Sequence, residues 1–250
     1  MLKIENKPKT NYYDLDIYKK RLFYQTIKED KSPIKIWKKL ENGCSIGTIQ
    51  YSEENVEILE KLLQSFSEQY GEVIDRDAAK EELMLYQNKG KCFIYFNEDN
   101  IPISMNGVIY NEDNVSVDFI KRNGEEPKSL YFYGLSTLKE YRGKGACREL
   151  IKFAIQYAYY NHFDLVYART DLINSNSEWI MAKAGLQICT YDEKIIAEWV
   201  DVTDNKGDYR LHMWLPFHDN IVCFPKEKAI YADKETREIQ EHKTKIYQRG

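Results

Sequence analysis

The chain has 250 residues, of which 43% are hydrophobic, enough to bury the core of one large domain or of a domain with extensions. Its formal net charge of −4 argues against broad nucleic-acid binding, which requires a surplus of Lys and Arg over one face. No uncharged stretch approaches the roughly 18 residues of a membrane-spanning helix, and we expect no secretory signal, so the predicted partner is a small molecule or a protein.

Three regions follow one another along the chain. Residues 1–44 are polar and rich in lysine, and we predict an N-terminal extension with one short strand within residues 32–40. Residues 45–217 carry a denser pattern of strands and helices and are predicted to form the main domain. Residues 218–250 are predicted to be a C-terminal tail. Because the apolar positions of the tail are too sparse to bury a helix face well, we expect a loosely docked helix or a mobile end.

The main domain is predicted to begin with a strand and two helices. The strand covers residues 45–51, and Ser52 follows where a helix cap is expected. Apolar residues between Val56 and Phe66 then recur at helical spacing. A second helix is predicted to begin near Asp75 and to end before Gly90.

The rest of the domain alternates between strands and helices. We predict strands at 91–96, 103–110, 115–120 and 129–138, the first two joined as a hairpin. They are followed by a helix at 147–158, a strand at 164–170, a helix at 174–185, and strands over 186–200 and 209–217. This alternation indicates an α/β (α+β) fold with a mixed sheet and helices on its faces.

The five cysteines are odd in number and widely spaced, with no CxxC pair and no histidine at metal-ligand spacing. This usage is typical of reduced thiols. We therefore expect a cytoplasmic protein without a metal site.

The sequence reads YRGKGAC between the predicted strand 129–138 and the predicted helix 147–158. A strand that runs into Gly-x-Gly and then a helix presents free backbone N–H groups where the helix dipole favours negative charge. The charged residues around the loop sum to +3, from Lys139, Arg142, Lys144, Arg148 and Lys152 against Glu140 and Glu149. The pattern predicts an anion site, most often a phosphate site.

Common nucleotide and hydrolase motifs do not fit this loop. The dinucleotide pattern GxGxxG fails at Arg148, and the P-loop GxxxxGK[ST] fails because Gly145 follows Lys144. The nucleophile elbow GxSxG fails because the segment around Ser136 lacks the second glycine. Another phosphate-bearing ligand, such as ATP or NAD, is one alternative for the loop.

Residues 142–147 resemble the acyl-CoA pyrophosphate loop of the GNAT superfamily of N-acyltransferases, whose pattern is [Q/R]-x-x-G-x-[G/A]. Arg142 and Gly145 match this pattern, and Cys147 stands at the final small position. A second segment resembles the family's N-x-x-A-x-x-L-Y-x-K-x-G-F pattern through Asn174, Ser177, Ile180, Met181, Lys183, Gly185 and Leu186. The resemblance implies the GNAT fold, with a central mixed, mostly antiparallel sheet that splays at the cofactor slot and helices on both faces.

The resemblance also implies acetyl-CoA (CoA) as the cofactor. The backbone amides that would hold its pyrophosphate are those of Arg142, Gly143, Lys144, Gly145, Ala146 and Cys147. The strand edge at Leu135, Thr137 and Leu138 would pair with pantetheine, and Asn174 would contact the pantetheine arm. Gly134 lies inside this strand pattern, where glycine often marks a bulge, and a bulge there would splay the strand from its neighbour.

Acyl transfer to an amine requires a neutral nucleophile, a stabilised oxyanion and a proton for the leaving thiolate. An amine with a pKa of ~10.4 costs about 4.6 kcal/mol to deprotonate at pH 7, so a base, reached directly or through water, is valuable. A strand amide near Thr137 can hold the oxyanion.

The expected acid and base are missing from their usual positions. In the family, a Tyr often supplies the acid where this chain has Met181, and a Glu base often lies where it has Tyr131 and Tyr133. The catalytic candidates are therefore Tyr133, Tyr131 and Asp171, with Ser136 as another. A role in sheet packing or edge hydrogen bonding is the alternative for each. Cys147, at a helix N-terminus, is a candidate for a lowered pKa, although packing against CoA is expected before nucleophilic attack.

The sequence says little about the amine that accepts the acetyl group. Residues 53–82 carry ten Asp or Glu against three Lys or Arg. In the GNAT fold these helices border the acceptor groove, so the imbalance favours a cationic amine by electrostatic steering, with a solvated helix face as the alternative. We predict an N-acetyltransferase that moves an acetyl group from acetyl-CoA directly to a primary amine of a small molecule or protein. The alternative, favoured by Met181, is a non-catalytic acyl-CoA-binding or scaffold protein of the same fold.

Overall fold

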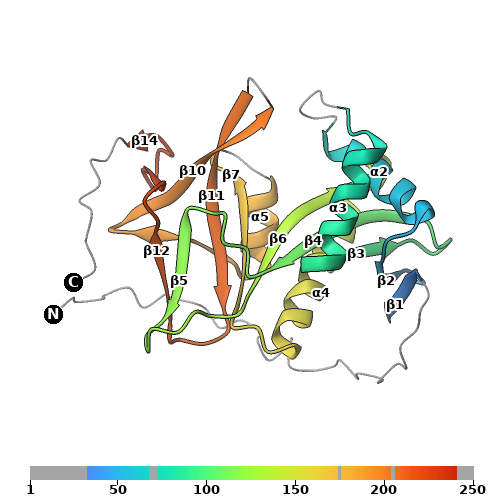
Figure 1. Ribbon diagram of the computed structural model, residues 1–250, viewed down its shortest axis with the longest axis horizontal. Coiled ribbons are helices and arrows are strands. Elements are labelled where there is room, and N and C mark those ends of the chain that lie inside the picture. The colour runs from blue at the N-terminus through green and yellow to red at the C-terminus, as the bar shows by residue number, and fades with distance from the viewer. Residues whose placement is uncertain (1–32, 68–72, 174–175, 204–205, 241–250) are drawn as a thin grey trace. The chain divides into compact units, whose positions relative to one another are not determined.

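The computed structural model describes residues 33–67, 73–173, 176–203 and 206–240 (Figure 1). These residues form one compact unit. Its helices are α2 (Glu53–Ser67), α3 (Arg76–Lys89), α4 (Ala146–Tyr160) and α5 (Asn176–Lys183), with a short 3₁₀-helix η2 (Lys139–Tyr141). No helix in these ranges has both the length and the apolarity that crossing a membrane requires.

A large mixed sheet runs through this unit. In spatial order its path is β1 (Ile34–Lys39), β2 (Ser45–Ile49), β3 (Gly90–Phe96), β4 (Pro102–Tyr110), β6 (Ser129–Thr137), β7 (Leu165–Asp171), β11 (Lys206–Pro216), β10 (Lys194–Thr203), β13 (Ile230–Ala232) and β14 (Ile239–Gln240). β8 (Gln187–Ile188) pairs with β11, and β9 (Thr190–Tyr191) pairs with β10. Among the strand pairs of the described residues only β6 and β7 are parallel, so the predicted mixed, mostly antiparallel sheet is confirmed.

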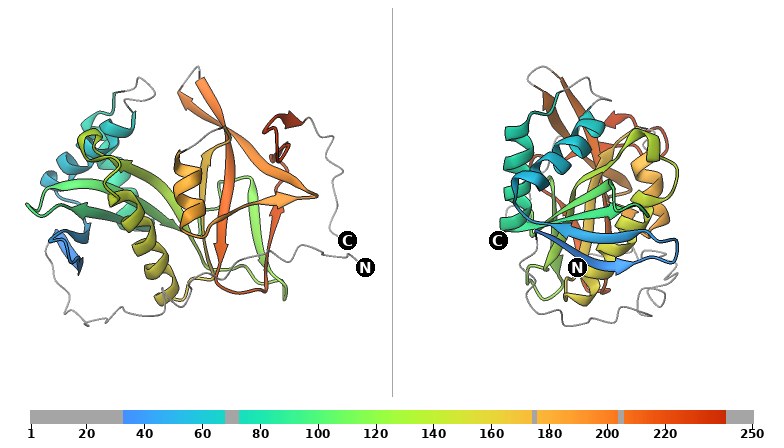
Figure 2. Two further views of the ribbon diagram at one scale, coloured as in Figure 1. Left: turned by 180° about the vertical axis from the view of Figure 1, so that it is seen from behind. Right: turned by 90° about the vertical axis from the view of Figure 1, so that its right-hand side faces the viewer.

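Helices cover both faces of the sheet. Tyr86 of α3 lies against Gly107 of β4, whereas Tyr157 of α4 hydrogen-bonds to Tyr110 of the same strand. Residues 107 and 110 lie on opposite sides of the pleat because side chains alternate along a strand. The views from behind and from the side show α2 and α3 on one face and α4 and α5 on the other (Figure 2).

The caps and apolar stripes that the sequence predicts do form. Ser52 Oγ accepts a hydrogen bond from the Asn55 amide at 3.1 Å, and Asp75 Oδ1 accepts one from the Ala78 amide at 2.8 Å. These bonds satisfy amides that have no partner within their own helix, which fixes where α2 and α3 begin. The buried stripe of α2 consists of Val56, Leu59, Leu62 and Leu63.

A bulge interrupts β6 at the predicted place. Gly107 of β4 pairs with Gly134, but the next residue, Val108, pairs with Phe132, so Tyr133 is the extra residue. Pairing of β6 with β7 begins at Ser129 and ends at Phe132, which lies opposite Ala168. Beyond this point the two strands separate, which confirms the predicted splay.

The C-terminal tail differs from the predicted helix or mobile end. Within residues 218–240 it forms β13, which pairs with β10, and β12 (Ile221–Pro225), which pairs with β5 (Val117–Lys121) in a second, two-stranded sheet. A strand has to bury only alternate residues and can complete an open sheet edge, so apolar positions too sparse for a helix are sufficient. Residues 241–250 lie outside the described part of the chain.

The sheet also crosses both predicted domain boundaries. β1 belongs to the predicted extension, yet it pairs with β2 across the boundary at residue 44. At the other end β13 continues the sheet beyond residue 217. The division at residues 44 and 217 therefore does not coincide with the limits of the sheet.

The two-stranded sheet is packed onto the main sheet by aromatic rings. Phe119 of β5 stacks on Trp214 of β11 with centroids 5.4 Å apart and contacts Tyr167 of β7 at 5.0 Å. Aromatic pairs of this kind add stabilisation beyond the area they bury. Phe119 therefore helps to fasten the second sheet to the main one.

Replacing Phe119 with Ala is expected to lower the free energy of unfolding by about 3–5 kcal/mol, because it leaves a cavity between the two sheets. Phe224 on the paired β12 is 36% exposed, against 7% for Phe119, so Phe224→Ala is the matched control with a much smaller loss. Urea unfolding followed by Trp fluorescence measures both. Equal losses would show that the stack of Phe119 on Trp214 does not fasten the second sheet.

Candidate functional site

The glycine loop between β6 and α4 adopts a backbone that only glycine accepts readily. Gly143 and Gly145 have φ angles of 77° and 91°, and Gly145 caps α4. The first hydrogen bond of α4 runs from the Glu149 amide to the Gly145 carbonyl at 3.1 Å, so the amides before Glu149 have no helix carbonyl to bond. A Cβ atom at Gly143 would meet nothing within 4 Å. The loop is thus an open set of amides at a helix N-terminus, as an anion site requires.

The Arg142 side chain anchors this loop to the neighbouring elements. Its Nη2 donates to the Ser65 carbonyl at 2.7 Å, and its Nε donates to the Thr137 carbonyl at 3.1 Å, which ties the loop to α2 and to the end of β6. Its backbone amide donates to the Lys139 carbonyl at 3.3 Å. The amides that face open space therefore begin at Gly143, one residue later than the sequence predicts.

The β6 edge presents backbone groups to the opened side of the sheet. The Leu138 amide donates to the Ile103 carbonyl of β4 at 3.0 Å. Because an antiparallel ladder alternates, the amides of Leu135 and Thr137 point away from β4, toward the side where pairing with β7 has ended. An extended ligand can add to such an edge as a further strand.

Two other predicted cofactor contacts have different outcomes. Asn174 lies outside the described residues. Burial raises the pKa of the Cys147 thiol to about 12, so the lowered pKa considered for this helix N-terminus is wrong. Cys147 remains a thiol at neutral pH and packs at the start of α4.

Tyr131 and Tyr133 lie side by side across the bulge. Tyr131 is buried, and its hydroxyl accepts a hydrogen bond from Arg169 Nε at 2.6 Å. Burial raises the Tyr131 pKa to about 12 despite Arg169, and burial also raises the pKa of Tyr133, which remains 45% exposed. Both phenols therefore hold their protons at neutral pH and can donate protons but not accept them.

The remaining candidates are engaged in the fold. Asp171 forms an ion pair with Arg210 of β11. Ser136 donates its hydroxyl hydrogen bond to the Leu62 carbonyl at 2.6 Å, which secures α2 to β6. Met181 is buried in α5 and cannot donate a proton.

A buried polar network supports Tyr131 from the far side. Arg169 Nη1 donates to Glu198 Oε1 at 2.6 Å, and the Ser116 amide donates to Glu198 Oε2 at 2.7 Å. Burial alone would raise the Glu198 pKa, but hydrogen bonds and charges from His212 and Arg169 hold it well below its usual range. Ser116 and His212 are fully buried, so we assign the network to the positioning of Arg169.

A carboxyl group that sequence reasoning missed lies at the bulge. A Cβ atom at Gly134 would be 3.4 Å from Glu82 Oε1 and 2.9 Å from Tyr86 Oη, both from α3. The sequence held one signal of this arrangement, a Glu and a Tyr four residues apart, which share a helix face. Their contact with β6 depends on the pairing of Gly107 with Gly134, which is not local in the sequence.

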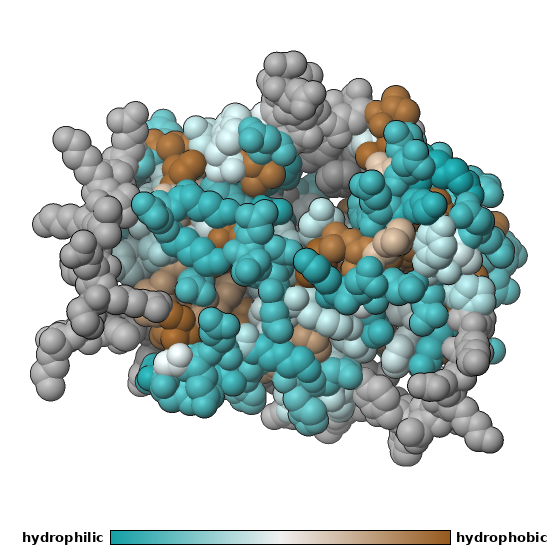
Figure 3. Space-filling model, viewed as in Figure 1, coloured by the Kyte–Doolittle hydropathy of each residue, from teal (hydrophilic) through white to brown (hydrophobic). Residues whose placement is uncertain are grey.

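The acidic residues of α2 are largely neutralised by neighbours. Glu53 forms an ion pair with Arg76 at 2.8 Å, and Glu57 forms one with Lys61 at 2.8 Å. Hydrophilic side chains predominate over α3, which faces the viewer (Figure 3). This part of the acidic excess fits a solvated helix face.

Comparison with known proteins agrees with this geometry. Residues 55–178 match the acetyltransferase (GNAT) family model. The chain belongs to the GNAT acetyltransferase family. No curated protein sequence matches the chain. The GNAT family uses acetyl-CoA as its acetyl donor, so this GNAT protein is an N-acetyltransferase.

Two solved structures share the fold of this GNAT protein at low sequence identity. A putative phosphinothricin N-acetyltransferase is 12% identical with a TM-score of 0.51, over 70% of this chain and 100% of that one. An N-acetyltransferase from Staphylococcus aureus Mu50 is 12% identical with a TM-score of 0.50, over 69% of this chain and 97% of that one. A chain in the structure of the NatC complex bound to Gag peptide and CoA also matches. It is 18% identical with a TM-score of 0.49, over 69% of this chain and 99% of that one.

Gly145→Ala is expected to weaken CoA binding at least about tenfold, because a Cβ strains the left-handed backbone and stands at the loop amides. Gly124→Ala is the matched control, since Gly124 has a φ of 87° in the turn after β5 and a Cβ there meets nothing within 4 Å. Calorimetric titration of CoA into each variant gives the dissociation constants. Equal affinities would contradict a pyrophosphate site in this loop.

Proposed function

We propose that this GNAT domain transfers the acetyl group of acetyl-CoA directly to a primary amine of a small molecule or a protein. The observation that carries the proposal is that an open glycine loop directly follows a free strand edge. The open glycine loop at Gly143 and Gly145 follows the β6 edge from which β7 has separated after Phe132. An anion cradle joined to a free strand edge fits a ligand with a pyrophosphate and an extended amide-bearing arm.

The residues that would hold the donor follow from this geometry. The amides from Gly143 to Cys147 would bind the pyrophosphate, and Lys144 and Arg148, both exposed, add positive charge there. Leu135, Thr137 and Leu138 would line the pantetheine arm. Bound acetyl-CoA would supply the thioester.

The chain's own groups can stabilise charge and move protons at the transfer point. A β6 amide directed away from β4, such as that of Leu135 or Thr137, suits an oxyanion. Tyr133 lies at the bulge, is partly exposed and keeps its proton at neutral pH. We assign it the acid that protonates the leaving sulfur, in place of the Tyr that Met181 replaces.

The acceptor class is the broader part of the proposal. The acidic excess of residues 53–82 favours a cationic amine, although ion pairs neutralise part of it.

The five cysteines are free thiols, which fits the cytoplasmic location that we propose. Met181 cannot donate a proton, which favours the second candidate, a non-catalytic acyl-CoA-binding protein, and turnover separates the two.

The direct test is release of CoA thiol from acetyl-CoA with spermidine, tyramine and a tetrapeptide with a free α-amino group as probes. Turnover with at least one amine and no acetyl adduct on the protein alone, both checked by mass spectrometry, is the expected result. Binding of CoA without turnover of any probe would favour the non-catalytic alternative.

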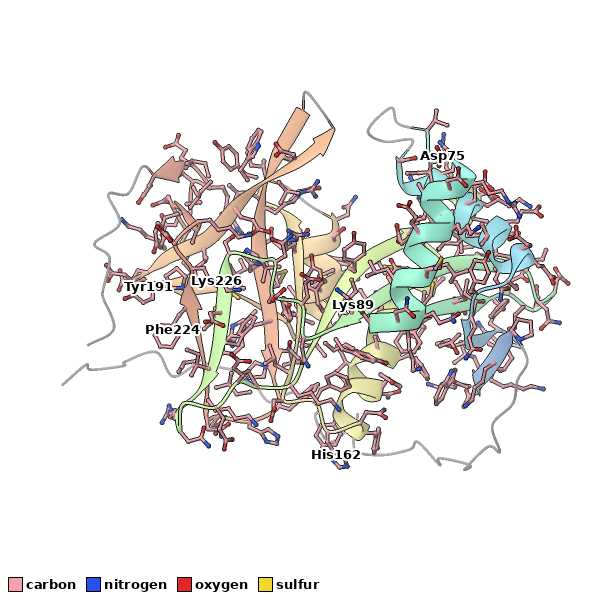
Figure 4. All side chains as sticks on the ribbon, in the orientation of Figure 1. Asp75, Lys89, His162, Tyr191, Phe224 and Lys226 are labelled. Atoms are coloured by element: carbon pink, nitrogen blue, oxygen red, sulfur yellow. The ribbon has the colours of Figure 1, made fainter. Side chains whose placement is uncertain are left out.

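Tyr133→Phe is expected to lower kcat about 100-fold with little change in CoA affinity, because it removes the proton donor but keeps the ring. Tyr191→Phe is the control, since Tyr191 is a partly exposed Tyr of β9, away from α3 (Figure 4). Steady-state rates of the two variants decide the assignment. Equal kcat values would remove Tyr133 from the chemistry.

A further inference from the structure

Two residues of α3, Glu82 and Tyr86, pack against a pair of glycines in the sheet. α3 begins after its cap, Asp75, and ends at Lys89 (Figure 4). Within it, Tyr86 Oη donates a hydrogen bond to Glu82 Oε1. A Cβ atom at Gly107 would lie 2.1 Å from Tyr86 Cζ, and one at Gly134 would lie 2.9 Å from Tyr86 Oη. Any other residue at Gly107 would displace the ring, so this glycine pair admits the Tyr86 hydroxyl and the Glu82 carboxyl to the backbone of β6.

The Glu82 carboxyl lies beside the proposed point of transfer. Gly134 follows the bulged residue Tyr133 and precedes the β6 edge proposed to hold the donor. The Tyr133 ring meets the Tyr86 ring edge-on, with centroids 6.1 Å apart. Glu82 thus brings a carboxylate oxygen beside the strand on the α3 face, while the glycine loop leads into α4 on the opposite face.

The surroundings of Glu82 are short of positive charge. Tyr86 on its own helix, Tyr133 from β6 and Cys92 from β3 are the titratable groups that face it, and none of them is a cation. Arg169 acts on Tyr133 from β7 and is paired with Glu198. Within the described residues, no Lys or Arg forms an ion pair with Glu82. Burial raises its pKa above the ordinary carboxylate value, and the Tyr86 hydrogen bond opposes that rise only partly.

We propose that Glu82 is the base that takes a proton from the acceptor ammonium, directly or through one water. The proposal rests on the proposed function. Of the three ammonium hydrogens, one passes to the Glu82 carboxylate and then to solvent, one passes to the leaving sulfur by way of the Tyr133 hydroxyl, and one remains on the amide. The amine nitrogen forms the C–N bond as the C–S bond breaks, so no further reactant is required.

The geometry also distinguishes this role from that of a simple strut. A strut between α3 and the sheet requires only the Tyr86 hydroxyl and Oε1, and it would be satisfied by a neutral amide in place of the carboxyl. Glu82 is only partly buried, and its second carboxylate oxygen, Oε2, accepts no hydrogen bond from the described residues. A base requires such an uncommitted, ionisable oxygen near the reacting nitrogen.

Glu82→Gln tests the proposal, because glutamine keeps the shape and accepts the Tyr86 hydrogen bond but cannot take a proton. Glu81→Gln on the same helix is the matched control, since Glu81 is exposed. With the amine probe that turns over best, Glu82→Gln is expected to lose 100-fold or more in kcat, with CoA affinity by calorimetry and melting temperature unchanged. Glu81→Gln is expected to keep the wild-type rate.

The pH profile supplies a readout that a strut would not move. A base is inactive when protonated, so wild-type kcat/KM should fall as the pH falls through the Glu82 pKa, and this limb should vanish in Glu82→Gln. Tyr86→Phe removes a hydrogen bond that lowers the Glu82 pKa, so the limb should move to higher pH. NMR titration of ¹³C-labelled Glu in the cofactor-free protein should show the same upward displacement without any turnover.

The outcomes separate this proposal from the one on which it rests. Turnover by wild type that persists in Glu82→Gln, or a Glu82 carboxyl that titrates at or below its ordinary value, overturns the role of Glu82 and leaves the acetyltransferase intact. A wild type that binds CoA but turns over none of the probes overturns both.

Discussion

The packing of the Tyr86 side chain against Gly107 and Gly134 is the constraint on which the geometry of the site depends. The ring and hydroxyl occupy the space of two Cβ atoms, so α3 approaches the sheet closely at one cross-strand pair. At this pair the register of β6 shifts by one residue, and Tyr133 is turned out. Pairing with β7 ends one residue earlier, at Phe132. The close approach of α3, the bulge and the free strand edge thus lie next to one another at these two glycines.

The two faces of the sheet then carry different chemistry. The glycine loop and the N-terminus of α4 provide amides and positive charge, which suit a phosphate ligand. On the α3 face, Tyr133 and Glu82 lie at the bulge, and the Arg169–Glu198 pair behind them fixes Tyr131. The strand edge between the faces is where a thioester and an amine would meet. The second sheet of β5 and β12 supports the β7 and β11 side of this arrangement through Phe119.

Local signals in the sequence predicted much of the fold. Caps at Ser52 and Asp75, the apolar stripe of α2, and the two glycines before α4 act over a few residues, so periodicity and turn chemistry reveal them. Non-local partners were beyond this reasoning. The tail forms strands because β10 and β5 offer edges to pair with, and the Arg142 side chain binds Ser65, far away in sequence. Glu82 was counted as one of many surface acids because its contact with Gly134 exists only in the folded sheet.

Hydrogen exchange of the backbone amides with and without acetyl-CoA tests the central claim most directly, because it reports on the groups that are said to bind. The account predicts slower exchange at Gly143 to Cys147 and at Leu135 and Thr137 when acetyl-CoA is added, with no change in β13 or β14. Unchanged exchange in the loop and along the β6 edge, with protection elsewhere in the chain, would contradict it.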